Sequence, residues 1–525
     1  MRIAGGRAPA RPGPGEIGAL FAAAFPGKRL VVVSNREPYE HRWSEAGVPE
    51  ARRPAGGLTS AVDPLLQAVG GVWIAWGSGE ADAAVADAAG RVAVPPEDPR
   101  YVLRRVWLDA RDVRDYYHGF CNQFLWPLCH LRPGLTRLRA RYWDRYRAVN
   151  ARFADVVLEE VQGGDSAVWF HDYHLALAPA RVRRAAPQLS LAHFWHVPWP
   201  PYEVFRVAPQ AEELIAGLLA NDLLGFHLAS YAAHFLHCAA EVLGAEVDWE
   251  AGVASYGGHA CRVRALPISV DVEAFRRAAS GPQAEAQCAR LRARYAPPGG
   301  QLGLGVDRLD YSKGIPERLK ALDLLWERHP EFRGRFSFLQ VAVPSRTEVR
   351  AYDELEHKVE RLVWEINDRY GSGRWRPVRL VKRALPPEQL ALLYRAADLC
   401  IVSSLQDGMN LVAKEFVASQ VDGRGVLLLS RFTGAAAELE GCIEINPYDP
   451  EDFAARIRDA LLLPPSARAA RMQAMQRGLR TIYDWLADVV RAWSGADEGW
   501  AAPWAPPAGP PRAGLGHPGP PAGPL

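Results

Sequence analysis

The chain has 525 residues, of which 49% are hydrophobic and 23% charged, and its formal net charge at pH 7 is +2. This length exceeds what one hydrophobic core supports, so we expect two large domains. The nearly balanced charge excludes a strong basic field for nucleic acid, and any phosphate must be held by individually placed residues.

The seven cysteines are odd in number and scattered, and several lie inside apolar runs, as Cys400 does in DLCIVSS. This pattern predicts reduced, buried thiols in a cytoplasmic protein. No CxxC pair indicates zinc. The sequence has neither a run of 18 apolar residues nor the apolar core of a signal peptide, so we expect no membrane insertion and no secretion.

In chain order, the sequence begins with a segment rich in Gly, Pro, Ala and Arg over residues 1–27, and it finishes with a Pro/Gly-rich segment over 498–525. Both are predicted to be disordered. Between them, apolar runs typical of strands alternate with helical periodicity. The runs in the first half include LVVVS, VWIAW, AVWF, LAHFWHV and LLGFH, and those in the second half include LGLGV, FSFLQVAV, VRLVKR, LCIVSS and VLLLS.

This alternation predicts an α/β protein whose parallel sheets are joined by crossover helices. We expect two doubly wound domains, over residues 28–268 and 269–470, that face each other across a cleft. A helix within residues 471–497 is predicted to pack back onto the first domain.

The most informative segment is SSLQDGMNLVAKEFVASQ over residues 403–420, which joins a buried strand to a helix that begins near Asn410. Ligands bind at the carboxyl ends of such strands, and a helix start offers free N–H groups to a phosphate. Asp407 and Glu415 add carboxylates, which suit the hydroxyls of a sugar. A solvated turn followed by an ordinary amphipathic helix is the alternative interpretation.

A second strand end in the same half carries GVDRLDYSKG, with Arg308 and Lys313 five residues apart. Two cations at one strand end suit a diphosphate, because arginine offers a planar fork and lysine a mobile point charge. The alternative is a surface network in which Arg308 pairs with Asp307 or Asp310.

The first half offers its own candidates. Arg36 follows LVVVS, and Gly56 and Gly57 open a helix where the backbone could approach a ligand closely. Tyr117 and Trp126, in DYYHGFCNQFLWP, offer aromatic faces to a sugar ring, although such residues more often belong to a core.

Two further candidates lie near strand ends. Asp172 lies in HDYH, and His196 lies in HFWHVPWP, where the following prolines would fix its direction toward the cleft. His171 and His174 are expected to bond to the backbone instead of a metal, and no HExxH or phosphate-binding GxxxxGK[ST] motif is present. We therefore expect no metal and no cofactor.

Taken together, SNR, AGGL, YYxxFxNxxLWP, WxHDYHL, HxPWP, ANDLLGFH, GVDRLDYSKG, VPSR and QDGMNLVAKE resemble the retaining trehalose-6-phosphate synthase family of glycosyltransferases. The resemblance runs from residue 28 to about residue 490. It implies the glycosyltransferase-B fold and transfer of glucose from a nucleotide-glucose, with UDP-glucose expected, to glucose 6-phosphate. The sequence leaves uridine, guanosine and adenosine open as the donor base.

The resemblance also implies roles for individual residues. On the donor side, Arg308 and Lys313 would hold the diphosphate, and Glu415 would hold the ribose. The backbone of Leu411 and Val412 would bind the rest of the nucleotide. Asp407 and His196 would hold the glucose hydroxyls, and Gly57 would let the donor approach the first domain. On the acceptor side, glucose 6-phosphate would be held by Arg36, Tyr117, Trp126 and Arg346, with Asp172 on a sugar hydroxyl. The implied mechanism retains the anomeric configuration by same-face displacement, without a carboxylate nucleophile.

Some positions depart from the family pattern. Glu37-Pro38-Tyr39-Glu40 is similar to glucosylglycerol-phosphate synthases, which use glycerol 3-phosphate as acceptor. Trp195, Trp199 and Gln406 replace residues more common at their positions, and each is a candidate for tuning donor choice. A non-catalytic sugar-phosphate sensor is a further alternative, but it predicts loss of donor-site residues that are all present.

The charge, the motifs and the resemblance predict small-molecule substrates as partners, with no nucleic acid and no membrane. No DxDxT phosphatase motif appears, so release of free trehalose would require a separate phosphatase. The sequence leaves a homo-oligomer open.

Overall fold

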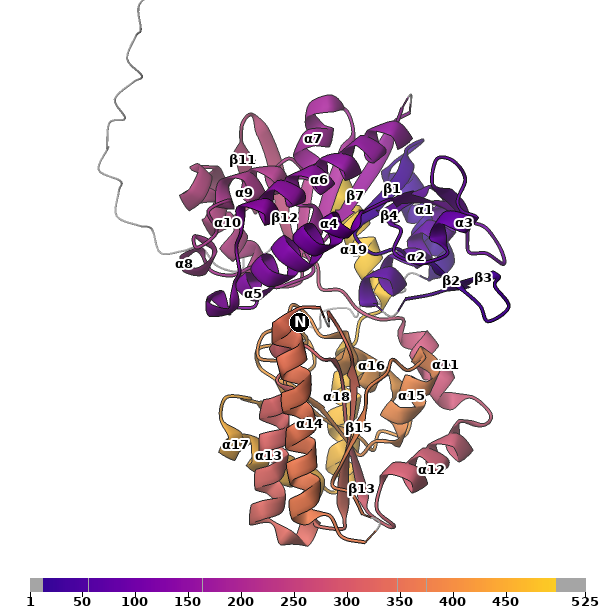
Figure 1. The fold of residues 1–525 in the computed structure, drawn as a ribbon, viewed down its shortest axis with the longest axis vertical. Coiled ribbons are helices and arrows are strands. Elements are labelled where there is room, and N and C mark those ends of the chain that lie inside the picture. The colour runs from indigo at the N-terminus through magenta and orange to yellow at the C-terminus, as the bar shows by residue number, and fades with distance from the viewer. Residues whose placement is uncertain (1–12, 55, 163, 347, 374, 497–525) are drawn as a thin grey trace, which may run out of the picture.

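The computed structural model describes residues 13–54, 56–162, 164–346, 348–373 and 375–496, and Figure 1 shows two lobes, one above the other. Each lobe is built on one largely parallel sheet with helices on both sides. The predicted α/β class with two Rossmann-like domains is confirmed.

The sheet of the first domain is parallel through its six central pairings and antiparallel at both edges. Its strands, in spatial order, are β10 (Glu246–Asp248), β11 (Val253–Tyr256), β12 (His259–Ala265), β9 (Leu223–Phe226), β8 (Ser190–Phe194), β7 (Ser166–His171), β1 (Arg29–Ser34), β4 (Val72–Trp76), β6 (Tyr101–Val106) and β5 (Arg91–Val94). A separate hairpin pairs β2 (Glu40–Trp43) with β3 (Pro49–Arg52). Val31, Val32 and Val33 on β1 are fully buried, because both faces of a parallel sheet are covered.

The helices of the first domain cover both faces of its sheet. They are α1 (Pro14–Ala24), α2 (Gly57–Val69), α3 (Asp82–Val85), α4 (Ala110–Asp112), the π-helix η1 (Val113–Leu125), α5 (Trp126–Cys129), η2 (Pro133–Leu135), α6 (Ala140–Glu160), η3 (Tyr173–Leu175), α7 (Ala178–Ala185), α8 (Tyr202–Phe205), α9 (Ala211–Leu219) and α10 (Ala229–Leu243).

The second domain has an entirely parallel sheet with the doubly wound strand order. Its strands, in spatial order, are β15 (Val378–Val381), β14 (Phe336–Val343), β13 (Gln301–Arg308), β16 (Leu399–Val402), β17 (Val426–Ser430) and β18 (Ile443–Ile445). Its helices are α11 (Val272–Ser280), α12 (Ala284–Tyr295), η4 (Tyr311–Lys313), α13 (Ile315–Arg328), η5 (Pro330–Phe332), α14 (Arg350–Tyr370), α15 (Pro387–Ala396), α16 (Leu411–Ser419), η6 (Gly434–Ala437), α17 (Pro450–Leu462) and α18 (Pro465–Gly478).

The predicted disorder of residues 1–27 is wrong for the part that the structure describes. Ile17 and Phe21 on helix α1 are buried, as is Phe25 directly after it, and the Phe25 ring lies 4.8 Å from the ring of Trp493. These apolar residues recur every four positions and so form one helical stripe, which the Gly- and Ala-rich composition concealed. Residues 1–12 and 498–525 lie outside the described residues.

The chain crosses between the domains twice, at adjacent places. The first crossing lies between β12 and α11, where the predicted boundary falls, and the second lies between α18 and the last helix, α19 (Ile482–Ser494). Val270 forms a β-bridge with Thr481, and the Ser269 hydroxyl donates to the Arg480 carbonyl. The predicted return segment 471–497 is therefore too long at its start: α18 contacts α16 and β17, and only α19 packs on the first domain, as Figure 1 shows in yellow.

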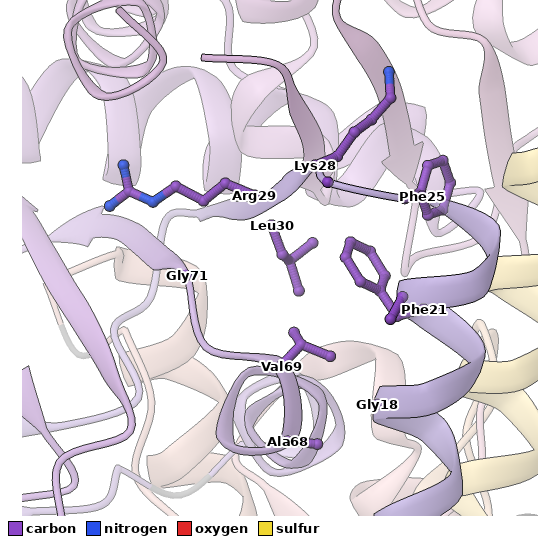
Figure 2. Close-up of a pocket in the computed structure, with 11 residues that line it drawn as sticks. Gly18, Phe21, Phe25, Lys28, Arg29, Leu30, Ala68, Val69 and Gly71 are labelled. Carbon is purple, nitrogen blue, oxygen red and sulfur yellow. The ribbon is translucent and has the colours of Figure 1, made fainter. Parts of the chain in front are cut away.

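A pocket of about 320 Å³ lies between α1, the end of α2 and the start of β1 (Figure 2). Phe21, Phe25 and Leu30 line it, while the side chains of Lys28 and Arg29 extend away from these three. Because it opens at the amino end of β1, it lies at the opposite sheet edge from the residues predicted to bind substrates.

Candidate active site at the domain cleft

The candidate residues of both domains follow the carboxyl ends of their strands. Arg36 follows β1, Asp172 follows β7 and His196 follows β8 in the first domain. Arg308 ends β13 and Asp407 follows β16 in the second. The candidate residues thus lie at the strand ends where parallel α/β sheets bind ligands.

The donor loop is buried and held by polar contacts, so the solvated-turn alternative is wrong. Asp407 is only 9% exposed. Its Oδ2 accepts hydrogen bonds from Lys313 Nζ at 2.6 Å, Asn410 Nδ2 at 3.0 Å and Ser404 Oγ at 3.1 Å. Asn410 also caps α16, because its side chain accepts from the N–H of Ala413.

These contacts set the charge of Asp407. Burial alone would raise its pKa, but the ammonium group of Lys313 and the hydrogen bonds bring that pKa below its ordinary value. Asp407 is therefore a carboxylate at neutral pH. A cation suited to a diphosphate and an acceptor suited to sugar hydroxyls meet at one point of the cleft.

The surface network considered for Arg308 is not the arrangement found. Asp307 pairs with Arg318 at 2.6 Å, and Asp310 pairs with Arg346 at 3.2 Å. The guanidinium of Arg308 instead lies over an aromatic ring, that of Trp126 in the first domain, 5.4 Å from the ring centroid. Arg308 thus faces the cleft.

Two glycines allow the domains to touch. A Cβ atom on Gly57 would lie 2.3 Å from Cδ1 of Leu411, and one on Gly408 would lie 2.5 Å from the carbonyl oxygen of His196. Both distances are below any ordinary contact. The structure therefore places Gly57 against the donor candidate Leu411, and it adds Gly408, which the sequence analysis did not single out.

The start of α16 carries the remaining donor candidates. Leu411 and Val412 are half-buried in its first turn. Glu415, one turn later, accepts a hydrogen bond from the hydroxyl of Tyr394 at 2.8 Å, and burial raises its pKa. Leu411 and Glu415 share a helix face because four residues separate them.

Sequence reasoning missed a contact between the domains at the same loop. The Tyr231 hydroxyl, on α10, donates to the carbonyl of Asp407 at 3.2 Å and accepts from Nε2 of Gln406 at 3.3 Å. Gln406 therefore touches the opposite domain. Trp195 and Trp199, by contrast, are at most 1% exposed and fill the core, so neither faces a donor.

The acceptor candidates also converge. Tyr117 lies on η1, and burial would raise its pKa, but the cations of Arg36 and Arg346 lower it below the ordinary value. Arg346, from the second domain, lies 4.0 Å from the ring centroid of Trp126. Trp126 thus contacts the guanidinium groups of both Arg346 and Arg308.

Asp172 and His196 lie side by side after the neighbouring strands β7 and β8. Asp172 has a left-handed backbone (φ 70°), and its Oδ1 accepts from the backbone N–H of His196 at 3.2 Å. Burial raises the pKa of Asp172 to about 7. The pKa of His196 lies well below its usual range, mainly because the imidazole is buried and also because the His171 ring is close, with Nδ1 of His171 at 3.2 Å from Nε2 of His196. His196 is thus neutral.

Within the described ranges, no three His, Cys, Asp or Glu side chains come together as metal ligands. In that same part of the chain, no helix combines the length and apolar character needed to cross a bilayer.

The glycosyltransferase family 20 model matches residues 28–494. The chain belongs to glycosyltransferase family 20. Membership makes it a hexosyltransferase, and the predicted resemblance is confirmed.

Several curated relatives in the family are similar over most of the chain. The UDP-forming α,α-trehalose-phosphate synthase of Schizosaccharomyces pombe is 34% identical over 467 residues, which cover 86% of this chain and 88% of the relative. A bifunctional trehalose-6-phosphate synthase/phosphatase of Thermoproteus tenax is 38% identical over 474 residues, covering 88% and 62%. The chain spans 59% of the length of a synthase from Dictyostelium discoideum, to which it is 34% identical over 85% of its own length.

Solved structures of family 20 agree with the fold. A UDP-forming α,α-trehalose-phosphate synthase from Burkholderia xenovorans, in complex with glucose-6-phosphate, superposes with a TM-score of 0.79 at 32% identity, covering 89% of this chain and 100% of that one. A structure from E. coli bound with UDP-2-fluoro glucose gives a TM-score of 0.79 at 32% identity, covering 89% and 99%. The glycosyltransferase-B architecture is therefore shared.

Proposed function

We propose that this hexosyltransferase transfers glucose from UDP-glucose to glucose 6-phosphate and forms trehalose 6-phosphate with retention of configuration. The observation that carries the proposal is the presence of two cationic groups in one cleft. Arg308 and Lys313 come from the strand end of β13, while Arg36 and Arg346 approach Tyr117 from different domains. Two groups of cations suit two phosphorylated substrates.

In this proposal the donor side stabilises the leaving group. Negative charge develops on the diphosphate as the glycosidic bond breaks, and Arg308 and Lys313 are positioned at one strand end to stabilise it without a metal. The carboxylate of Asp407 holds glucose hydroxyls and so fixes the sugar relative to the diphosphate. The leaving phosphate oxygen then takes the proton of the acceptor hydroxyl.

The proposed acceptor side acts by orientation. Arg36, Arg346, Tyr117 and Trp126 hold the sugar phosphate, and Asp172 accepts a hydrogen bond from a sugar hydroxyl. Because Arg36 and Arg346 belong to different domains, binding of one phosphate by both favours the closed cleft. Closure aligns the acceptor hydroxyl with the anomeric carbon.

Glycerol 3-phosphate is the less favoured acceptor. The segment that suggested it contains Glu37, whose carboxylate is 1% exposed and accepts from Arg105 Nε at 2.9 Å and from the N–H of Ser78 at 2.8 Å. Tyr39, also in that segment, is 3% exposed. These side chains are buried in the domain interior, so they offer no exposed surface to an acceptor.

The test measures UDP release from UDP-glucose with either acceptor, together with the masses of the products. We expect a disaccharide phosphate with glucose 6-phosphate only. Product with glycerol 3-phosphate only would overturn the acceptor assignment, and absence of product with UDP-, GDP- and ADP-glucose would favour the sensor.

The mechanism has its own test in Asp407→Asn. We expect slower transfer and no trapped covalent intermediate, because Asp407 holds hydroxyls and does not attack the anomeric carbon. Intact-protein mass spectrometry would detect a glucosyl adduct on any carboxylate, and such an adduct would exclude same-face displacement.

A further inference from the structure

A buried amide lies behind the acceptor residues. Asn122 is 1% exposed and lies on η1, whose π-helical turns bring each residue close to the fifth residue before it. Its Nδ2 donates to the carbonyl of Tyr117, five positions earlier, at 2.7 Å. Its Oδ1 accepts from the hydroxyl of Tyr173 at 2.9 Å.

These contacts continue into the second domain. Nη2 of Arg346 donates to the hydroxyl of Tyr173 at 3.3 Å, and the Tyr173 ring lies 5.8 Å from the ring of Trp126. A continuous chain of hydrogen bonds therefore runs from Arg346 through Tyr173 and Asn122 to the backbone of Tyr117. It joins two acceptor residues that belong to different domains.

The direction of each hydrogen bond in this chain is determined. The carbonyl of Tyr117 can only accept, so the nitrogen of the Asn122 amide must point to it and the oxygen must point to Tyr173. The single hydroxyl proton of Tyr173 then goes to Asn122, which leaves a lone pair for Arg346. Asn122 thus holds the backbone carbonyl of Tyr117 and orients the Tyr173 hydroxyl that accepts from Arg346.

We propose that Asn122 is a positioning residue for the acceptor site, holding the backbone of Tyr117 directly and Arg346 through Tyr173. The proposal rests on the proposed function. Its value to catalysis is preorganisation, because groups already held in place lose less entropy when the phosphate binds.

Two variants test the proposal by steady-state kinetics with UDP-glucose and glucose 6-phosphate. Tyr173→Phe removes one hydroxyl and keeps the ring, and we expect KM for glucose 6-phosphate to rise by roughly fivefold to tenfold, the effect of one lost hydrogen bond. Asn122→Leu removes both contacts, and we expect a rise of roughly 30-fold or more. KM for UDP-glucose should stay within about twofold of the wild-type value, because the donor cations do not touch Asn122.

The matched control is Tyr101→Phe. Tyr101 is also buried, at 4% exposure, and its hydroxyl donates to Asp63 at 2.6 Å, outside the cleft. This variant loses one buried tyrosine hydroxyl as well, so we expect a lower melting temperature with both KM values unchanged. Equal rises in the two KM values for Tyr173→Phe, or a rise in the control as large as in Tyr173→Phe, would overturn the proposal.

A second measurement does not depend on transfer activity. Melting temperatures of Tyr173→Phe, Arg346→Met and the double variant form a double-mutant cycle. The chain of hydrogen bonds predicts that the two shifts in melting temperature combine less than additively. Additive shifts in melting temperature would refute the coupling of Arg346 to Tyr173. If the wild-type protein transfers no glucose to glucose 6-phosphate yet the cycle is non-additive, the proposed function fails while the positioning of Arg346 by Tyr173 stands. If Asn122→Leu does not fold, Tyr173→Phe decides the kinetic test.

Discussion

Gly408→Ala perturbs the contact between the two domains. Its added Cβ would lie 2.5 Å from the carbonyl oxygen of His196 and 3.3 Å from Cδ2 of His227. Such an atom pair needs roughly 3.5 Å, so about 1 Å of separation must be added. Because His196 follows a buried strand, its backbone cannot yield cheaply, and the donor loop of the second domain must move away.

The expected result is a loss of activity without a comparable loss of folding. A misplacement of about 1 Å costs roughly 100-fold in rate, so kcat/KM for UDP-glucose should fall by about that factor. The measurement is steady-state UDP release, with melting temperature as the folding check. The clash lies between domains, so each domain retains its own core and we expect the melting temperature to change little.

Gly57→Ala is the control at the same cleft. Its Cβ would lie 2.3 Å from Cδ1 of Leu411, which is closer than the 2.5 Å contact of Gly408→Ala. The Leu411 atom, however, ends a flexible side chain that can rotate away. We therefore expect a clearly smaller loss than in Gly408→Ala. Equal losses in the two variants, or wild-type kcat/KM in Gly408→Ala, would refute the reasoning that a rigid carbonyl sets the domain separation.

Three further predictions concern buried charges. Arg105→Met should lower the free energy of unfolding by about 3–5 kcal/mol, because the Asp82 carboxylate, 2.8 Å from the guanidinium, would stay buried without its cation. Urea unfolding measures this free energy, and a loss under about 1 kcal/mol would contradict the prediction. Burial raises the pKa of Asp172 from 3.8 to about 7, so the folded protein keeps a proton that the unfolded chain releases. The contribution of Asp172 to stability is therefore complete below pH 3.8 and is lost as the pH rises through 7. Asp172→Asn should flatten that part of the profile when the free energy of unfolding is measured against pH. Lys313→Met should lower kcat at saturating substrates by roughly 100- to 1,000-fold, because the leaving diphosphate loses a stabilising cation and Asp407 loses its 2.6 Å partner; turnover within tenfold of wild type would contradict this role.

Much of the candidate donor site's geometry could be predicted because its signals are local in sequence. A buried strand, a loop and a helix start lie within residues 399–419, and the cap at Asn410 forms within three residues. Strand ends of one parallel sheet meet at one edge, so Lys313 and Asp407 could be expected together although 94 positions separate them. Local pattern plus sheet topology therefore suffices for this part.

Contacts between the domains could not be predicted in the same way. Tyr231 is one apolar-face residue of α10 by its spacing, and nothing around it indicates a bond to the carbonyl of Asp407. The role of Asn122 likewise depends on the π-helical turn, which places its side chain on the Tyr117 carbonyl. A helix of ordinary pitch would direct Asn122 elsewhere.

The segment Glu37-Pro38-Tyr39-Glu40 shows that a departure from a family pattern beside a candidate residue need not place side chains in the site. Its similarity to glucosylglycerol-phosphate synthases made glycerol 3-phosphate the alternative acceptor. The Glu37 carboxyl is deeply buried and accepts a hydrogen bond from Arg105, 68 positions away, and burial and then Asp82 raise its pKa to about 8. Arg36 itself remains exposed, with its carbonyl accepting from the hydroxyl of Ser34 at 2.6 Å. If Arg36 binds the acceptor phosphate as proposed, the segment acts through the backbone that presents Arg36, and substitutions in it should alter affinity for that phosphate before they alter which acceptor is chosen.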